Sequence, residues 1–174
     1  MNEISNYNYA QGPKSEQVNS PCNVMMVAEK PSIALSISES LSNNFTKKIT
    51  KGKGMPLYTF RGEFQGMSAN FKVTSVAGHV FNRDFPKEYQ DRRKDPISLF
   101  DAPTIRNLAG SAGIARHLQA VSSNVDFIVL WLDCDKEGEN ICFEVLDICR
   151  RNIPKSKRQR VFRAKFSSIA KKDI

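Results

Sequence analysis

The sequence predicts an α/β domain in which helices flank a central, mostly parallel sheet. A short apolar segment, residues 24–28, ends on the charged pair Glu29 and Lys30, and a helical pattern opened by Pro31 follows it. A second apolar segment, residues 127–132, ends on a run of carboxylates and is again followed by a helical pattern. Continuous hydrophobic runs of this length are typical of parallel strands buried on both faces.

Size and composition favour one domain with a single core. The 174 residues are 40% hydrophobic, which is enough for one core. Residues 1–22 are polar and are expected to form a disordered tail, so that residues 23–174 form the domain. The chain lacks a stretch of about 18 apolar residues and the apolar block of a signal peptide, so no membrane contact is expected. The four cysteines lack Cys-x-x-Cys spacing, which favours reduced thiols.

Positive charge is concentrated toward the end of the sequence. The net charge is +8, but residues 150–174 hold ten basic residues and one acidic residue, so this segment alone carries +9. A local basic segment in a chain that also holds clustered carboxylates indicates a polyanionic partner. For residues 155–160 taken alone, a solvated loop is an equally good interpretation.

Apolar spacing and turn residues predict the remaining elements. Pro31 suits the first position of a helix that apolar residues continue to about residue 42. Alternation over residues 58–76, interrupted by a turn at 65–67, predicts two or three strands. The other expected segments are a basic loop over 47–54, a charged loop over 82–103 with a helical turn near 97–100, helices over 104–121 and 137–151, a strand over 160–166, and a helix from Ser167 or Ser168 that is unfinished at Ile174.

Four carboxylates follow the second apolar strand at intervals of two: Asp133, Asp135, Glu137 and Glu139. In open α/β sheets the ligand crevice lies at the carboxyl ends of the strands. If the backbone there stays extended, alternate side chains project to the same side, so several carboxylate oxygens are expected to converge on one cation. Mg²⁺ takes oxygen ligands of this kind.

Four sequence blocks carry a family resemblance. They are Val-Ala-Glu-Lys-Pro-Ser at 27–32, Thr-Ser-Val-Ala-Gly-His at 74–79, the block at 130–147 that begins Leu-Trp-Leu-Asp-Cys-Asp-Lys-Glu-Gly-Glu, and Val-Phe-Arg-Ala-Lys-Phe-Ser-Ser-Ile at 161–169. Together they resemble the Toprim domain of type IA topoisomerases, with the closer likeness to the beta form of eukaryotic topoisomerase III. The resemblance spans about residues 24–174 and implies the Rossmann-like Toprim fold.

The resemblance also implies roles for the acidic residues and their neighbour. Glu29 matches the acid of the first Toprim strand and is the candidate proton donor to the leaving 3′ oxygen. Asp133, Asp135 and Glu137 match the Asp-x-Asp-x-Glu triad. The resemblance implies that Mg²⁺ is held by some of these four acids, with Asp133 and Asp135 as the main ligands and Glu29 or Glu137 as the additional one. Lys30 matches a lysine near the scissile phosphate, where a compact cation neutralises developing charge.

Three further residues are candidates for nucleic-acid contact. His79 matches a Gly-His pair that follows a strand in the family, although a hydrogen-bonded structural histidine is the favoured interpretation. Arg163 and Lys165 alternate with apolar residues and are expected to face nucleic acid, with solvent contact at a strand end as an equal alternative.

Enzymes of the resembled family cut one strand with a tyrosine, pass another strand through the break and reseal it without ATP. The tyrosines here, Tyr7, Tyr9, Tyr58 and Tyr89, do not lie in a sequence like the family's tyrosine motif. The chain is therefore expected to be an N-terminal fragment that is inactive alone. The implied partners are single-stranded DNA, with RNA as an alternative, and an accessory protein. The implied location is the nucleus, with the cytoplasm as a second compartment.

Other functions are open at this point. An Asp-x-Asp after a buried strand also occurs in haloacid dehalogenase-like phosphatases, but those expect Thr or Val where this chain has Glu137. Toprim nucleases and primases share the acidic site and need no tyrosine. A non-catalytic Toprim module that binds nucleic acid or protein is the third class.

Overall fold

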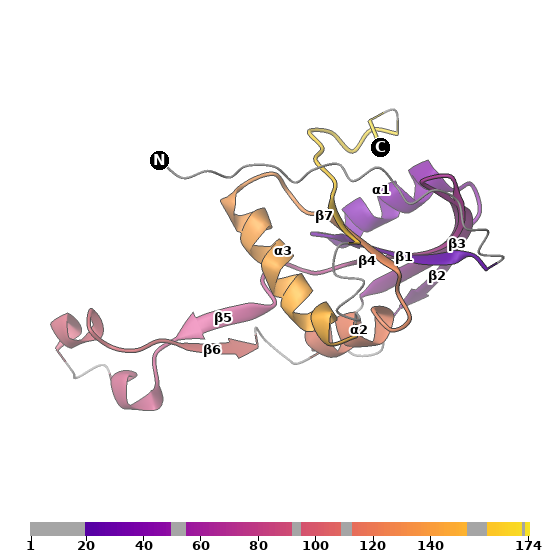
Figure 1. Ribbon diagram of the computed structural model, residues 1–174. Coiled ribbons are helices and arrows are strands. Elements are labelled where there is room, and N and C mark those ends of the chain that lie inside the picture. The colour runs from indigo at the N-terminus through magenta and orange to yellow at the C-terminus, as the bar shows by residue number, and fades with distance from the viewer. Residues whose placement is uncertain (1–19, 50–54, 92–94, 109–112, 153–159, 172) are drawn as a thin grey trace, which may run out of the picture.

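A six-stranded sheet forms the centre of the protein (Figure 1). The computed structural model describes residues 20–49, 55–91, 95–108, 113–152, 160–171 and 173–174. In spatial order the strands are β2 (Thr46–Ile49), β3 (Pro56–Phe64), β4 (Met67–Ser75), β1 (Cys22–Ala28), β7 (Phe127–Trp131) and β8 (Val161–Arg163). Strands β4, β1, β7 and β8 run parallel, and β2 and β3 add an antiparallel edge. The predicted α/β class with a mostly parallel sheet is confirmed.

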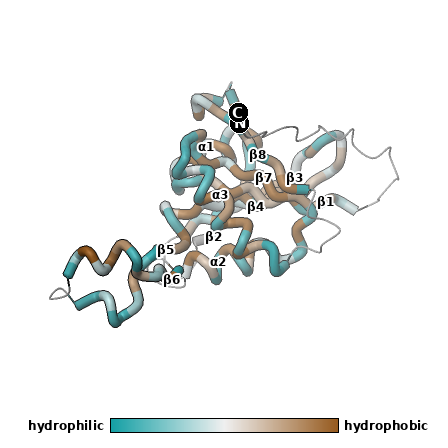
Figure 2. The backbone as a smooth tube through the Cα atoms, turned by 60° about the vertical axis from the view of Figure 1, so that its left-hand side comes forward, coloured by the Kyte–Doolittle hydropathy of each residue, from teal (hydrophilic) through white to brown (hydrophobic). Residues whose placement is uncertain are grey.

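Helices cover both faces of this sheet. The side chains of β1 accordingly alternate between two hydrophobic clusters, one on each face. Val24 and Met26 pack in one buried cluster with residues of α1, whereas Met25 and Val27 pack in a second cluster with residues of α2 and α3. The helices are α1 (Pro31–Leu41), α2 (Gly113–Val121) and α3 (Lys136–Cys149). Figure 2 shows the hydrophobic colour concentrated in the central strands. Because β1 is buried on both sides, its sequence is a continuous apolar run.

Several predicted elements are confirmed. The helices expected over 31–42 and 137–151 correspond to α1 and to α3 with the short η3 (Arg150–Asn152). The strands expected over 58–76 are β3 and β4, joined at Gln65 and Gly66, whose φ angles of 53° and 77° match a two-residue hairpin turn. The helical turn expected near 97–100 is η2 (Pro96–Leu99).

One large region differs from the prediction. The helix expected over 104–121 forms only from Gly113 onward, as α2. Before it, β6 (Ile105–Leu108) pairs with β5 (Phe81–Asp84), and the pair projects from the body as an arm that also carries η1 (Lys87–Tyr89) and η2 (Figure 1). The Arg106 guanidinium lies 3.6 Å from the ring centre of Phe81 and 2.8 Å from a carboxylate oxygen of Asp147 on α3. These contacts, distant in sequence, favour the strand over the helix.

Smaller corrections concern the two ends and one loop. The basic loop expected over 47–54 is strand β2 as far as Ile49, and residues 50–54 lie outside the described part. Strand β8 is shorter than the expected 160–166. Residues 167–171 and 173–174 are bends, turns and irregular backbone, so the helix expected from Ser167 or Ser168 is wrong for them. Most of the expected tail, residues 1–19, also lies outside the described part.

Two further observations concern the whole of the described structure. All four cysteines are free, and burial raises the pKa of Cys142 and of Cys149 to about 11. Within the described ranges, the longest apolar helices fall short of what is needed to cross a lipid bilayer.

Candidate active site

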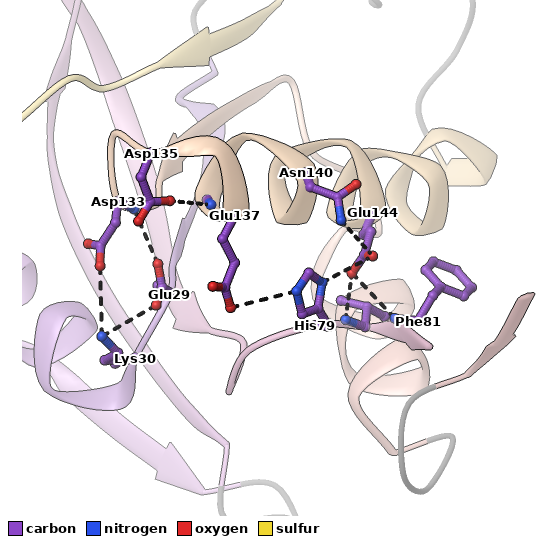
Figure 3. Close-up of polar contacts among 11 residues, drawn as sticks. Glu29, Lys30, His79, Phe81, Asp133, Asp135, Glu137, Asn140 and Glu144 are labelled. Atoms are coloured by element: carbon purple, nitrogen blue, oxygen red, sulfur yellow. Dashed lines mark hydrogen bonds and ion pairs between the residues drawn. The ribbon is translucent and has the colours of Figure 1, made fainter. Parts of the chain in front are cut away.

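The first half of the candidate site is the connection from β1 to α1. It consists of Glu29 and Lys30, because α1 begins at Pro31, whose fixed φ suits the first helical position. The Lys30 ammonium lies 3.3 Å from Glu29 Oε1 and 3.7 Å from Asp133 Oδ2 (Figure 3). Its hydrogen bond to Glu29 and the charge of Glu29 raise the pKa of Lys30, and the charge of Asp133 adds to this shift. The lysine is therefore a cation shared by two carboxylates from different strands.

The second half is the connection from β7 to α3. Asp135 is the N-cap of α3, and its Oδ1 accepts a 2.7 Å hydrogen bond from the Gly138 N–H. Gly138 packs directly on the Asp133 backbone, where an added Cβ would meet the Asp133 carbonyl oxygen well inside 3.0 Å. The helix thus begins at Lys136, one residue before the predicted start, so the extended backbone that would turn alternate carboxylates to one side does not reach Glu137. Asp133, Asp135 and Glu137 follow a strand-to-helix turn, so their side chains point in different directions.

The expectation that Glu29 lies beside the Asp133 run is confirmed. Strands β1 and β7 are parallel neighbours, with Ala28 opposite Trp131, so the residues that follow them meet at the same edge of the sheet. The Asp133 N–H donates to Glu29 Oε2 at 3.3 Å. Two acidic segments 104 residues apart in sequence are therefore joined at the carboxyl edge, which is where α/β proteins bind ligands.

A buried glutamate, which the sequence interpretation missed, lies next to this edge. Glu144 is on the inner face of α3, and its Oε2 accepts from the backbone N–H groups of Val80 at 2.7 Å and Phe81 at 3.3 Å. Its Oε1 lies 3.3 Å from His79 Nδ1, and His79 Nε2 lies 3.6 Å from Glu137 Oε1 (Figure 3). The favoured interpretation of His79 as a hydrogen-bonded residue agrees with these contacts. A charged residue on an apolar helical stripe was the available sequence signal for Glu144.

The two basic residues expected to face nucleic acid have different surroundings. The Arg163 guanidinium donates to the carbonyl oxygens of Leu130 and Asp133 and to the carboxylate of Glu139. Lys165, two residues further along, is exposed. The structure therefore joins Arg163 to the connection between β7 and α3 and leaves Lys165 on the surface. Nucleic-acid contact by either residue stays a prediction.

Whether these residues fit Mg²⁺ depends on their chemistry and placement. Among the residues that the structure describes, no group of three or more His, Cys, Asp or Glu side chains is arranged to hold a metal ion. Glu29 and Asp133 nevertheless place two carboxylates around one cation, the Lys30 ammonium. Mg²⁺ is commonly bound through one or two carboxylates, with water and substrate phosphate oxygens as its other ligands. The residues present fit such a partial, substrate-completed site.

Comparison with known proteins gives the family. Residues 24–169 match the Toprim domain. The chain is 51% identical over 154 residues to DNA topoisomerase 3-beta of Oryza sativa subsp. japonica and 49% identical over 153 residues to that of Arabidopsis thaliana, each time over 87% of this chain and 17% of the relative. It is 45% identical over 160 residues to DNA topoisomerase 3-beta-1 of Homo sapiens, over 87% of this chain and 18% of that protein.

The chain thus spans less than a fifth of the length of these relatives. Among solved structures, the G domain of the FeoB iron transporter of T. maritima aligns with a TM-score of 0.46 and 12% identity over 89% of this chain and 77% of that one, and it adds no argument about function. The family match covers the sheet, both acidic connections and Arg163, and on this ground the chain belongs to the Toprim domain family.

Proposed function

We propose that this chain is the Toprim part of a type IA topoisomerase and that it takes part in cutting and rejoining a single DNA strand. The observation that carries the proposal is the meeting of Glu29 and Asp133, from neighbouring parallel strands, around the ammonium of Lys30. The names of the relatives, DNA topoisomerase 3-beta and 3-beta-1, support this reaction class over other uses of a Toprim domain.

Each of these residues has a role in strand cleavage under this proposal. Lys30 has a side chain that is 59% exposed, so it can turn from the carboxylates toward a phosphate oxygen and offset the charge that develops there. Glu29, when protonated, gives its proton to the 3′ oxygen that leaves as the tyrosine oxygen bonds to phosphorus, while the tyrosine hydroxyl proton passes to water. On resealing, the attacking 3′ hydroxyl returns its proton to Glu29 and water protonates the departing tyrosine oxygen. The side chain of Glu29 is only 14% exposed, which restricts the positions from which it acts.

We further infer that the domain uses Mg²⁺. Glu29 and Asp133 would hold the ion. Asp135 and Glu137 are not arranged with them as further ligands, because Asp135 caps α3 through the Gly138 N–H and Glu137 lies toward His79. When bound, the ion would supply positive charge beside the phosphate oxygens of the DNA.

The attacking tyrosine is inferred to come from a segment outside this chain. Tyr58 is only 2% exposed within the core, and Tyr89 lies on η1 of the arm. Tyr7 and Tyr9 lie outside the described residues. The 174-residue chain is therefore expected to bind single-stranded DNA weakly and to cleave none of it. An accessory protein, RNA as a second substrate and a nuclear location stay predictions of the family resemblance.

A chimera tests the proposal. The chain replaces the matching segment of DNA topoisomerase 3-beta of Arabidopsis thaliana, and relaxation of negatively supercoiled plasmid is measured with Mg²⁺. We expect the chimera to relax DNA, Glu29→Gln and Asp133→Asn to abolish relaxation, and Lys30→Ala to reduce it at least about 100-fold, the size of effect known for a single charge-stabilising donor. Glu88→Gln, an exposed change on the arm, is the matched control and retains activity.

Two outcomes would contradict the proposal. A folded chimera that is as inactive as its Glu29→Gln variant would show that this chain does not complete a topoisomerase. Cleavage of single-stranded DNA by the 174-residue chain alone, lost in Asp133→Asn, would instead assign it to the Toprim nucleases.

A further inference from the structure

The side chain of Arg163 is engaged on all sides at the candidate site. Its Nη2 donates to the Asp133 carbonyl oxygen at 2.9 Å, and its Nη1 donates to the carbonyl oxygens of Leu130 at 3.2 Å and Ala164 at 2.6 Å. Its Nε donates to Glu139 Oε1 at 2.9 Å. The side chain is 18% exposed, whereas that of Lys30 is 59% exposed. The N–H groups of Arg163 are thus used in hydrogen bonds within the protein.

Apart from its neighbour Ala164, the oxygen acceptors of Arg163 lie on three successive parts of the chain. Leu130 belongs to β7, Asp133 to the connection and Glu139 to the first turn of α3. The guanidinium comes from the end of β8, the strand that pairs with β7. One planar group therefore fixes the strand end, the connection and the helix start relative to each other. A guanidinium presents several donors in a rigid fork, which the single ammonium of a lysine does not reproduce.

This arrangement acts on Asp133 through its backbone. The Asp133 carbonyl accepts from Arg163 and its N–H donates to Glu29, so both peptide groups of this residue are held. A held backbone restricts the positions of the Asp133 carboxylate, whose Oδ2 lies 3.7 Å from the Lys30 ammonium. Movement of this peptide by even a small amount would alter the spacing between the two carboxylates that share the cation.

We propose that Arg163 is a positioning residue that holds the Asp133 connection in the form that binds a divalent cation, and that it does not bind nucleic acid. The proposal rests on the proposed function only in taking Glu29 and Asp133 as the cation site. Lys165, on the same strand end and exposed, provides an internal comparison.

The test uses the 174-residue chain and two titrations. Mn²⁺, which favours the same carboxylate and water ligands as Mg²⁺, is titrated by electron paramagnetic resonance, and single-stranded DNA is titrated in EDTA by fluorescence anisotropy. We expect Arg163→Gln and Arg163→Lys to weaken Mn²⁺ binding about 10-fold, the low end for residues that orient metal ligands. DNA affinity in EDTA stays within about twofold, because phosphate contacts set it. Lys165→Ala leaves Mn²⁺ affinity unchanged.

The sign of the Arg163→Gln effect separates positioning from plain electrostatics. Removing a positive charge near a cation site should by Coulomb's law strengthen Mn²⁺ binding, so weaker binding reports lost positioning. Thermal unfolding in EDTA identifies a variant that fails to fold, and the other Arg163 variant then carries the test.

Unchanged or tighter Mn²⁺ binding in a folded Arg163→Gln chain would overturn the proposal, as would a loss of DNA affinity in EDTA without a change in Mn²⁺ affinity. An equal loss of Mn²⁺ affinity in Lys165→Ala would also overturn it. If Glu29→Gln and Asp133→Asn bind Mn²⁺ as the unaltered chain does, the cation site itself is wrong, and that result is distinct from a failure at Arg163.

Discussion

The two connections that meet at the candidate site are held in different ways. The β1–α1 connection is two residues long, and Lys30 gives α1 no side-chain cap. The β7–α3 connection is fixed by the Asp135 cap, by the close packing of Gly138 on the Asp133 backbone and by the hydrogen bonds of Arg163. The β1–α1 connection is therefore restrained by its shortness and by the contacts of Glu29 and Lys30 with Asp133. The β7–α3 connection is restrained in addition by a helix cap, by close backbone packing and by the guanidinium of another strand.

Under the proposed function, this difference suits a different task on each side. Carboxylates that share a cation need fixed spacing, and the many restraints on the β7–α3 side provide it. A lysine that moves between a carboxylate and a phosphate needs freedom, which an exposed side chain on a short turn has. If the comparison holds, changes on the β7–α3 side should cost more stability than a change on the β1–α1 side.

The largest effect is expected at Gly138. In Gly138→Ala the new Cβ would collide with the backbone of Asp133, which cannot move aside without breaking its contacts. We expect the free energy of unfolding to fall by about 3 kcal/mol or more, the upper range for overpacking. Urea unfolding followed by circular dichroism measures it. The matched control is Gly62→Ala, whose Cβ would meet only the Phe71 ring at 3.2 Å. Equal losses in the two variants would contradict the predicted role of Gly138.

The second effect is expected at Glu144, which ties α3 to the start of β5. Glu144→Ala removes the acceptor of the Val80 and Phe81 N–H groups, and unpaired buried donors should cost roughly 2–3 kcal/mol in total. Glu144→Gln keeps one carbonyl oxygen as an acceptor and should lose less. Hydrogen exchange of the Val80 and Phe81 amides gives a direct measurement. Slow exchange at both amides in Glu144→Ala would show that they have other partners.

The third effect is expected at the helix cap. Asp135→Ala removes the acceptor of the Gly138 N–H, and loss of such a cap costs about 1 kcal/mol. Asp135→Asn retains a capping oxygen and should stay within a few tenths of a kcal/mol of the unaltered chain. Urea unfolding of the three chains side by side measures this order. If Asn and Ala were equally destabilising, the charge of Asp135 and not its cap would hold the helix start.

The body of the fold and the meeting of Glu29 with Asp133 could be predicted because they depend on local patterns. Continuous apolar strands, Pro31 at a helix start and the shared carboxyl edge of parallel strands all leave a trace in the sequence. The arm could not be predicted in this way. Strand β6 has four residues, all exposed, and its pairing with β5 depends on partners more than 20 residues away.

The finer details of the site could not be predicted from the sequence for a related reason. The carbonyl oxygens that Arg163 binds are present in every residue, so the sequence does not mark them as acceptors. The buried Glu144 was visible as a charge on an apolar stripe, but its partners are backbone N–H groups from another element. Side-chain contacts to backbone atoms become apparent only when the fold is known.

The smallest effect is expected on the β1–α1 side. Pro31→Ala keeps helical geometry and removes only the restriction that proline places on the unfolded chain, so it should cost about 0.4–1 kcal/mol. Mn²⁺ affinity should stay within about twofold of the unaltered chain, because Ala28 and the strand pairing still set the position of Glu29. Urea unfolding and the Mn²⁺ titration measure both quantities. A loss of stability larger than that of Asp135→Ala would mean that Pro31 restrains the β1–α1 connection more strongly than the Asp135 cap restrains the β7–α3 connection, and the contrast between the two connections would then fail.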